Sequence, residues 1–310
     1  MKTQNYLIAV VGPTAIGKTA VGIEIAKKYQ AEIISCDSRQ FFKEMYLGTA
    51  VPNPEELAAI PHHFIQNKSI FEPFSVGDFE VEALEQLDGL FAQNNIQVMV
   101  GGSGLYVDAV IKGFDTFPDI DPQVRIQLIA DFETLGQDYL KQTLAKKDPV
   151  HFQNLLEKNP QTLENPQRMM RYLEVTLGSG QPYSSFLGKR TTVRNFTPII
   201  VGLSGERQEM YDRINRRVDM MMQNGLLEEV KALHPHKDLN ALQTVGYREL
   251  FDFIDGTCSL EDAVEEIKKN TRRFAKRQMT WFNKTAGVTW FDYTTPLSDI
   301  TQHIDTQLNK

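Results

Sequence analysis

The sequence predicts an α/β fold in which helices flank a parallel sheet and an all-helical insertion interrupts the sheet-forming chain. Strand-like and helix-like segments alternate over the first third of the chain, and a glycine-rich loop joins the first strand to the first helix. The β-type patterns vanish between about residues 115 and 194. Strands separated by helices of this length pair in parallel through crossovers, which predicts the sheet.

Local patterns predict the individual elements. The apolar run YLIAVV is too short for a secretory signal and leads directly into the glycine loop, which indicates a buried strand. Ser75 and Asp78 lie at the start of a helix. The expected order is a strand at 6–11, a helix at 18–29, a strand at 31–35, a helix at about 78–94, a strand at 96–100, and a strand at 198–203 followed by long helices.

The middle of the chain predicts a separate domain. Prolines punctuate short helical patterns there, and no strand pattern is present. We therefore expect a core domain formed by 1–115 and 195–310, and a helical insertion domain at 116–194.

Composition narrows the class of protein. No apolar run approaches the roughly 20 residues that a membrane span needs. Cys36 and Cys258 show no recognisable pairing spacing, so we expect two reduced thiols in a cytoplasmic protein that does not enter a membrane.

The stretch GPTAIGKT, residues 12–19, has the pattern of a phosphate-binding loop between a strand and a helix. Backbone N–H groups of such a loop form an anion cradle, and Lys18 adds a positive charge. The Thr19 hydroxyl is suited to bind Mg²⁺. The sequence thus predicts a P-loop NTPase-like sheet that binds a phosphate-bearing ligand.

A Mg²⁺-binding carboxylate typical of triphosphatases is absent from the expected strand end. The candidate strand IQVMV runs into GGSGLY, which offers glycines and Ser103 instead. Asp37 follows the second strand and is expected at the same sheet edge as the glycine loop. A lone Asp there could be a turn cap, but its place opposite a phosphate cradle favours a proton acceptor.

Positive charge is concentrated near the C-terminus. Seven basic residues and no acidic ones occur between Lys268 and Lys284, although the whole chain carries −7. The segment predicts a helix opened by Ser259 and Asp262, whose basic face either is solvated or binds a polyanion. The two Trp residues are expected in the core. The basic positions on this helix are Lys268, Lys269, Arg272, Arg273, Lys276 and Arg277.

An ordered series of motifs resembles the bacterial tRNA dimethylallyltransferase family over about residues 6–291. The motifs are GPTAIGKT, SCDSRQ, LGTAVP, PHHF, FSVGDF, VGGSGLY, NPQRMMRYLEV, VGYREL and RRFAKRQMTWF. The resemblance implies transfer of a dimethylallyl group from dimethylallyl diphosphate to N6 of the adenosine 3′-adjacent to the tRNA anticodon, with release of diphosphate. It also implies a P-loop core with a helical insertion.

The resemblance assigns roles around the donor. Asp37 matches the family's general base, Arg217 and Thr19 match groups that act on the leaving diphosphate, and Ser103 stands where the family usually has Thr. Mg²⁺ is the implied cofactor, with Thr19 as its ligand. The donor diphosphate is expected to bind Gly12, Pro13, Thr14, Ala15, Ile16, Gly17, Lys18 and Thr19.

The same resemblance assigns contacts with tRNA, whose target base would be flipped out of its stack. Phe42, Val51 and Gln66 depart from the family pattern, and no role is carried over at Val51. The implied tRNA-contacting positions are Asp37, Ser38, Arg39, Gln40, Ser103, Arg125, Gln167, Arg168, Met169, Met170, Arg171, Gly246, Tyr247, Arg248, Lys276 and Arg277.

Two other functions compete with this interpretation. A small-molecule P-loop kinase would share the loop and an Asp after the second strand, but it would need an arginine-rich lid over ATP. An inactive RNA-binding protein would keep the basic helix without a reason to keep Lys18, Thr19 and Asp37 together. We expect an active monomeric enzyme.

Overall fold

The computed structural model describes residues 4–189 and 193–309, which fall into two compact units. One unit comprises the described parts of Met1–Lys112 and Arg194–Lys310, and the other comprises those of Gly113–Val193. Within the described ranges, no helix combines the length and the apolar character needed to cross a membrane.

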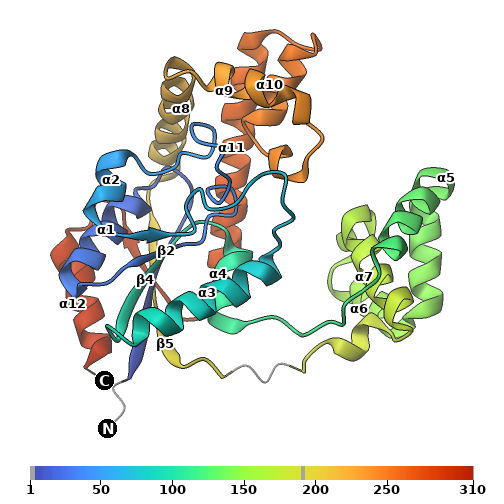
Figure 1. Ribbon diagram of the computed structural model, residues 1–310, viewed down its shortest axis with the longest axis horizontal. Helices are drawn as coiled ribbons and strands as arrows, with labels where there is room; N and C mark the ends of the chain where they lie inside the picture. Colours follow the sequence, from blue (N-terminus) through green and yellow to red (C-terminus); the bar gives the residue numbers. More distant parts are fainter. Residues whose placement is uncertain (1–3, 190–192, 310) are drawn as a thin grey trace. The chain divides into compact units, whose positions relative to one another are not determined.

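The first unit is built on a six-stranded sheet in which all neighbouring strands are parallel (Figure 1). The strand order β3-β2-β4-β1-β5-β6 puts β1 in the interior. Parallel pairing brings the loops that follow β1, β2 and β4 to one edge of the sheet. The strands are β1 (Asn5–Val11), β2 (Ile33–Ser35), β3 (His62–His63), β4 (Ile96–Val100), β5 (Phe196–Ser204) and β6 (Val288–Asp292).

Helices cover both faces of this sheet (Figure 1). Alternate residues of β1 face opposite sides, so Leu7 packs in a cluster with α3 and α4, whereas Ile8 packs in a cluster with α1 and α12. The helices of this unit are α1 (Lys18–Tyr29), α2 (Pro54–Ala59), α3 (Val76–Phe91), α4 (Gly104–Lys112), α8 (Arg207–Gln223), α9 (Leu226–Leu233), α10 (Tyr247–Ile254), α11 (Leu260–Phe282) and α12 (Leu297–Leu308).

A third core cluster joins the C-terminal helices to each other. Val218 of α8, Val230 of α9, Leu250 of α10 and Ile267 of α11 are buried in it. This cluster fixes α8 and α11 relative to each other, and both helices carry side chains that reach the carboxyl edge of the sheet.

The insertion unit is helical, as predicted, and no strand occurs among its described residues. Pro122, Pro149 and Pro166 each start a helix, because proline needs no hydrogen-bond partner for its nitrogen in the first turn. The elements are α5 (Pro122–Lys147), α6 (Pro149–Lys158), α7 (Pro166–Ser179) and the 3₁₀ segments η1 (Pro160–Glu164) and η2 (Tyr183–Phe186). Gly136, with φ 75°, interrupts the helical backbone of α5.

Most predicted elements are confirmed with small shifts. The start of α3 at Ser75 is a capping box in which Ser75 and Asp78 exchange hydrogen bonds, and the helix ends at Phe91 rather than 94. The second strand is shorter than predicted and spans only Ile33–Ser35.

The expectation that both tryptophans lie in the core is wrong for Trp281. Its side chain is 39% exposed, because the indole N–H reaches out to Asp108 Oδ2 at 3.0 Å instead of packing inward. Trp290 does pack against the core of the sheet.

The packing of the insertion core predicts that substitutions at two leucines of α5 change the free energy of unfolding by different amounts. Leu140 is fully buried and Leu135 is 57% exposed on the same helix. We expect Leu140→Ala to lower the free energy of unfolding by about 2–5 kcal/mol because it leaves a cavity. Leu135→Ala should change it by less than about 0.5 kcal/mol. Urea unfolding followed by circular dichroism would measure both, and equal effects would contradict the packing described.

Candidate active site at the carboxyl edge of the sheet

The glycine loop leaves β1 and starts α1 in a conformation that requires glycine. Gly12 has φ 143°, and a Cβ there would lie 2.4 Å from the backbone oxygen of Leu203 on β5. Gly17 has φ 106° at the N-cap of α1. The loop therefore packs against the neighbouring strand and presents the N-terminus of α1 to the cavity beside it.

Lys18 lies in the first turn of α1 and lines this cavity. Its Nζ donates to the carbonyl of Pro13 at 2.7 Å. The pKa of Lys18 is lowered to about 8, mainly by burial; the Asp37 carboxylate opposes this shift, and the Arg217 guanidinium contributes to it. An anion bound here would favour the charged form of Lys18.

Asp37 follows the short strand β2. One of its carboxylate oxygens, Oδ1, accepts the Arg39 N–H at 3.1 Å, which turns the chain after the strand. The loop after β4 approaches closely, since a Cβ on Gly101 would lie 2.4 Å from the Cys36 sulfur. Burial raises the pKa of the Cys36 thiol, which suits a structural role.

Ser103 connects the loops that follow β2 and β4. The Ser38 N–H donates to Ser103 Oγ at 3.1 Å, and the Ser103 hydroxyl donates to Ser38 Oγ at 3.2 Å. Ser103 retains the hydroxyl of the Thr that is usual in the family, and its hydrogen bonds to Ser38 hold the segment next to Asp37 in place.

Two cavities meet at this edge of the sheet. The first, of about 660 Å³, is lined by the glycine loop, Lys18, Thr19 and α8. The second, of about 310 Å³, is lined by Ser38, Arg39 and residues of α11. The residues common to both linings are Thr14, Asp37, Thr49, Ala50, Arg217 and Met221.

Arg217 reaches this junction from α8. Burial lowers its pKa, and the carboxylate of Asp37 opposes that shift. The junction thus places a carboxylate and a guanidinium between the phosphate loop on one side and a basic cavity on the other.

Three residues that support the site were not found from the sequence. Arg213 donates from Nε to the Ala15 carbonyl at 2.8 Å and lines the first cavity. Its position one helical turn before Arg217 was the available signal. Glu229 accepts backbone N–H groups of the segment 46–48. Gln278 of α11 bonds to two of the loops; it lies within the motif RRFAKRQMTWF, but no role was assigned to it from the sequence.

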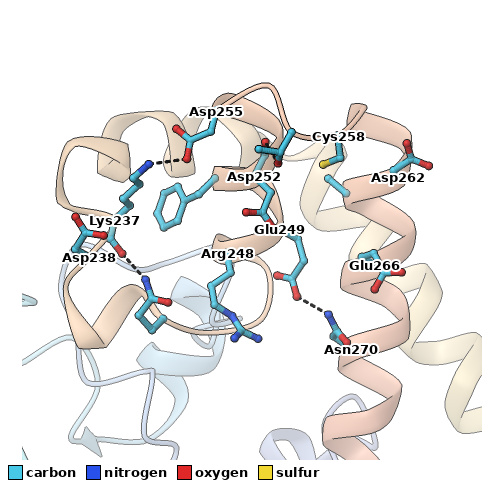
Figure 2. A pocket seen from close by; sticks show the side chains of 14 residues that line it. Lys237, Asp238, Arg248, Glu249, Asp252, Asp255, Cys258, Asp262, Glu266 and Asn270 are labelled. Carbon is cyan, nitrogen blue, oxygen red and sulfur yellow. Dashed lines mark hydrogen bonds and ion pairs between the residues drawn. The ribbon is translucent and has the colours of Figure 1, made fainter. Parts of the chain in front are cut away.

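A further pocket, of about 580 Å³, lies between α10 and α11 (Figure 2). Its one lysine, Lys237, is 2.6 Å from Asp255, and its buried Glu249 bonds to Asn270. Negative charge makes it unsuited to a phosphate. The carboxylates that line it are Asp238, Glu249, Asp252, Asp255, Asp262 and Glu266.

The family model described as IPP transferase matches residues 40–285.

The chain belongs to the IPP transferase family.

Relatives in this family match nearly the full chain. The tRNA dimethylallyltransferase of Flavobacterium psychrophilum is 60% identical over 98% of this chain and 99% of its own length. That of Flavobacterium johnsoniae is 58% identical over 97% of each. The solved tRNA isopentenylpyrophosphate transferase of Bacillus halodurans has a TM-score of 0.73 and 36% identity, and the match covers 99% of this chain and 97% of that one. The predicted family and P-loop NTPase-like fold are confirmed.

The unpaired basic face of α11 covers fewer residues than the run from Lys268 to Arg277 that the sequence predicted. Lys268 pairs with Asp219 of α8 and with Glu265, and Lys269 pairs with Glu266. Acids one turn earlier and on a neighbouring helix therefore neutralise its first part. Lys276 and Arg277, further along, are exposed, and Arg277 lines the second cavity.

The predicted RNA-contacting side chains of the insertion divide into two groups. Arg125 donates to Gln167 Oε1 at 2.7 Å, and Arg168 and Arg171 are exposed on α7. The assignment of Met169 and Met170 is wrong for their side chains. They are 0% and 3% exposed in the insertion core, because α7 turns that face towards α5.

The assignment of a tRNA contact to the Tyr247 side chain is also wrong. Tyr247 is fully buried, and its hydroxyl donates to Glu229 Oε1 at 2.6 Å. Its neighbours Gly246 and Arg248 do line the second cavity. Tyr247 and Glu229 together hold the segment 46–48, which forms part of the cavity walls.

This role of Tyr247 predicts a loss of stability. Tyr247→Phe removes a buried donor from the half-buried Glu229 carboxylate, so we expect the free energy of unfolding to fall by about 1–3 kcal/mol. The exposed Tyr46→Phe should change it by less than about 0.5 kcal/mol. Thermal and chemical denaturation would measure both, and an unchanged Tyr247→Phe protein would refute the structural role.

Proposed function

We propose that this protein transfers a dimethylallyl group from dimethylallyl diphosphate to N6 of the adenosine 3′-adjacent to the anticodon in tRNA and releases diphosphate. The observation that carries the proposal is the junction of the two cavities, where Asp37 and Arg217 lie between the phosphate loop and a basic, partly aromatic cavity. A donor on one side and an acceptor on the other would meet there.

The first cavity fits the donor. The loop amides, Lys18 and Arg217 would bind its diphosphate, and Arg213 supports the loop at Ala15. Apolar side chains that include Met221 and Val51 lie in the same wall and would contact the dimethylallyl tail. Val51, which departs from the family pattern after GTA, therefore adds apolar surface here.

The second cavity fits the acceptor. It is lined by Arg39, Arg248 and Arg277 for phosphates, and by Phe274 for a base. Its volume of about 310 Å³ suits one nucleoside extruded from the RNA. The adenine would enter with its amine towards Asp37.

Each bond that forms or breaks in this reaction, and the proton that is released, can be assigned to a substrate atom or a residue of the site. The N6 lone pair forms a bond to the terminal carbon of the dimethylallyl group while that carbon's bond to the diphosphate oxygen breaks. The N6 proton passes to a carboxylate oxygen of Asp37. Negative charge grows on the leaving diphosphate, where Lys18, Arg217 and the loop amides stabilise it. Closely packed walls would keep water from the allylic carbon.

We propose Mg²⁺ as the cofactor. The Thr19 hydroxyl lines the first cavity next to Lys18, and with diphosphate oxygens it forms a set of hard oxygen ligands that suits Mg²⁺. Among the described residues, no group of three or more His, Cys, Asp or Glu side chains is placed to hold a metal, so the diphosphate would supply most ligands. Bound Mg²⁺ would neutralise charge on the diphosphate.

We further propose that tRNA binds along exposed and half-buried polar residues of α11 and of the insertion. Lys276 and Arg277 in one unit, and Arg125, Gln167, Arg168 and Arg171 in the other, would contact the anticodon stem-loop. We also propose that the protein acts on tRNA as a monomer in the cytoplasm.

Label transfer tests this function. The protein is incubated with an unmodified anticodon stem-loop and labelled dimethylallyl diphosphate, and separately with labelled ATP and candidate small acceptors. Label from the prenyl donor should appear on the RNA only when the target adenosine is present. Transfer from ATP would support a kinase instead, and transfer from neither donor would refute the proposal.

Loss of the carboxylate should stop proton removal. We expect Asp37→Ala to lower kcat by about 10²–10⁴-fold while donor binding remains, because the loop that binds diphosphate is intact. Asp238→Asn, an exposed carboxylate outside both cavities, serves as the control. Turnover within about two-fold of the unaltered protein for Asp37→Ala would exclude Asp37 as the base.

The pKa of Lys18 predicts the pH dependence of donor binding. Its pKa is about 8 without ligand, and a bound diphosphate raises it, so the complex forms with charged Lys18. Donor affinity should therefore be steady below pH 8 and fall up to about ten-fold per pH unit above it. Titration calorimetry across this range would measure it. Lys18→Arg, which stays charged, should lose this dependence.

A further inference from the structure

The side chain of Gln278 joins two loops at the carboxyl edge of the sheet. Its Oε1 accepts the Thr14 N–H at 2.8 Å, and its Nε2 donates to the Gly102 carbonyl at 2.9 Å. The residue is only 5% exposed. A buried amide bonded at both ends fixes the distance and direction between its partners, since breaking either bond leaves a buried polar group unsatisfied.

The glycine loop and the loop after β4 are shaped around this amide. A Cβ on Gly102 would lie 2.3 Å from Gln278 Nε2 and 3.3 Å from the Gly12 carbonyl. The absence of a side chain at Gly102 is therefore what admits the amide between the loops.

Gln278 also lies between the two functional surfaces. On α11 it directly follows the exposed Lys276 and Arg277, which are proposed to contact RNA. Its partner Thr14 lines both cavities and lies in the loop proposed to bind diphosphate. No other side chain on the described part of α11 makes a hydrogen bond to the glycine loop.

We propose that Gln278 is a positioning residue for the transfer reaction. It holds the glycine loop against the loop after β4, so that the donor diphosphate places its allylic carbon in line with the acceptor amine next to Asp37. The amide touches neither substrate and acts through Thr14 and Gly102. This inference rests on the proposed function.

Gln278→Met tests the proposal, because methionine has a similar length and no comparable hydrogen-bonding groups. We expect kcat/KM for dimethylallyl diphosphate to fall at least about ten-fold, with the Kd for the anticodon stem-loop within about two-fold of the unaltered protein. Gln302→Met on α12, an exposed glutamine outside both cavities, is the matched control and should keep full activity. Gly102→Ala, which displaces the amide without altering it, should show the same donor-specific loss.

Gln278→Glu should make activity depend on pH in a way that a merely structural role of the side chain would not produce. A protonated glutamic acid can accept from Thr14 and donate to the Gly102 carbonyl, whereas the carboxylate cannot donate. Its activity relative to the unaltered protein should rise at least about five-fold as pH is lowered from about 8 to about 5.5, because burial raises a carboxyl pKa. The charged residues Lys18, Asp37, Arg213 and Arg217 line the adjoining cavity, and their own titrations occur in both proteins. The three cations would lower the pKa of the introduced carboxyl, whereas burial and Asp37 would raise it. The ratio for Gln278→Met should stay flat.

Three results would overturn the inference while leaving the proposed function intact. They are unchanged kcat/KM for the donor in Gln278→Met and Gly102→Ala, equal loss of donor and RNA binding with a lowered Tm, and a flat pH ratio for Gln278→Glu. Failure of the unaltered protein to transfer label would remove the proposed function, and this inference with it.

Discussion

The close approach of three loops at the carboxyl edge of the sheet is the constraint on which the site depends. Glycines make it possible. Gly12 lies against the backbone of β5, Gly101 lies against Cys36, and Gly102 leaves room for the Gln278 amide. Side chains at these places would push the loops apart and separate Asp37 from the phosphate loop. The parallel register of β1 between β4 and β5 sets the positions from which the loops start.

Around this edge, the arrangement of charge suits the proposed transfer of a group from a diphosphate. Lys18 lines the first cavity, Asp37 and Arg217 line both cavities, and the second cavity is also lined by Arg39, Arg248 and Arg277. The carboxylate opposes the burial-driven pKa shifts of both cations, which helps them stay charged before the donor arrives. Residues of opposite charge are thus neighbours at the place proposed for the leaving group and the base.

The sequence predicted the fold, and it singled out Lys18, Thr19 and Asp37, which the structure brings to one cavity, because these signals are local. A glycine loop between a strand and a helix, and an Asp at a strand end, are read from adjacent residues. It could not predict which side chains are buried by tertiary packing. Met169 and Tyr247 lie within motifs but face the core, and Lys268 meets Asp219 from another helix. Long-range hydrogen bonds such as those of Gln278 leave no pattern in the sequence.

We propose that departure of diphosphate is coupled to attack by the adenine amine beside Asp37. Single-turnover release of diphosphate, measured with two anticodon stem-loops that differ only in the target amine, tests it most directly. The account predicts one diphosphate per alkylated adenosine with the amine present, and no release above the RNA-free background when purine ribonucleoside replaces the adenosine. Equal release with both RNAs would show that the donor ionises without the acceptor and would contradict the account.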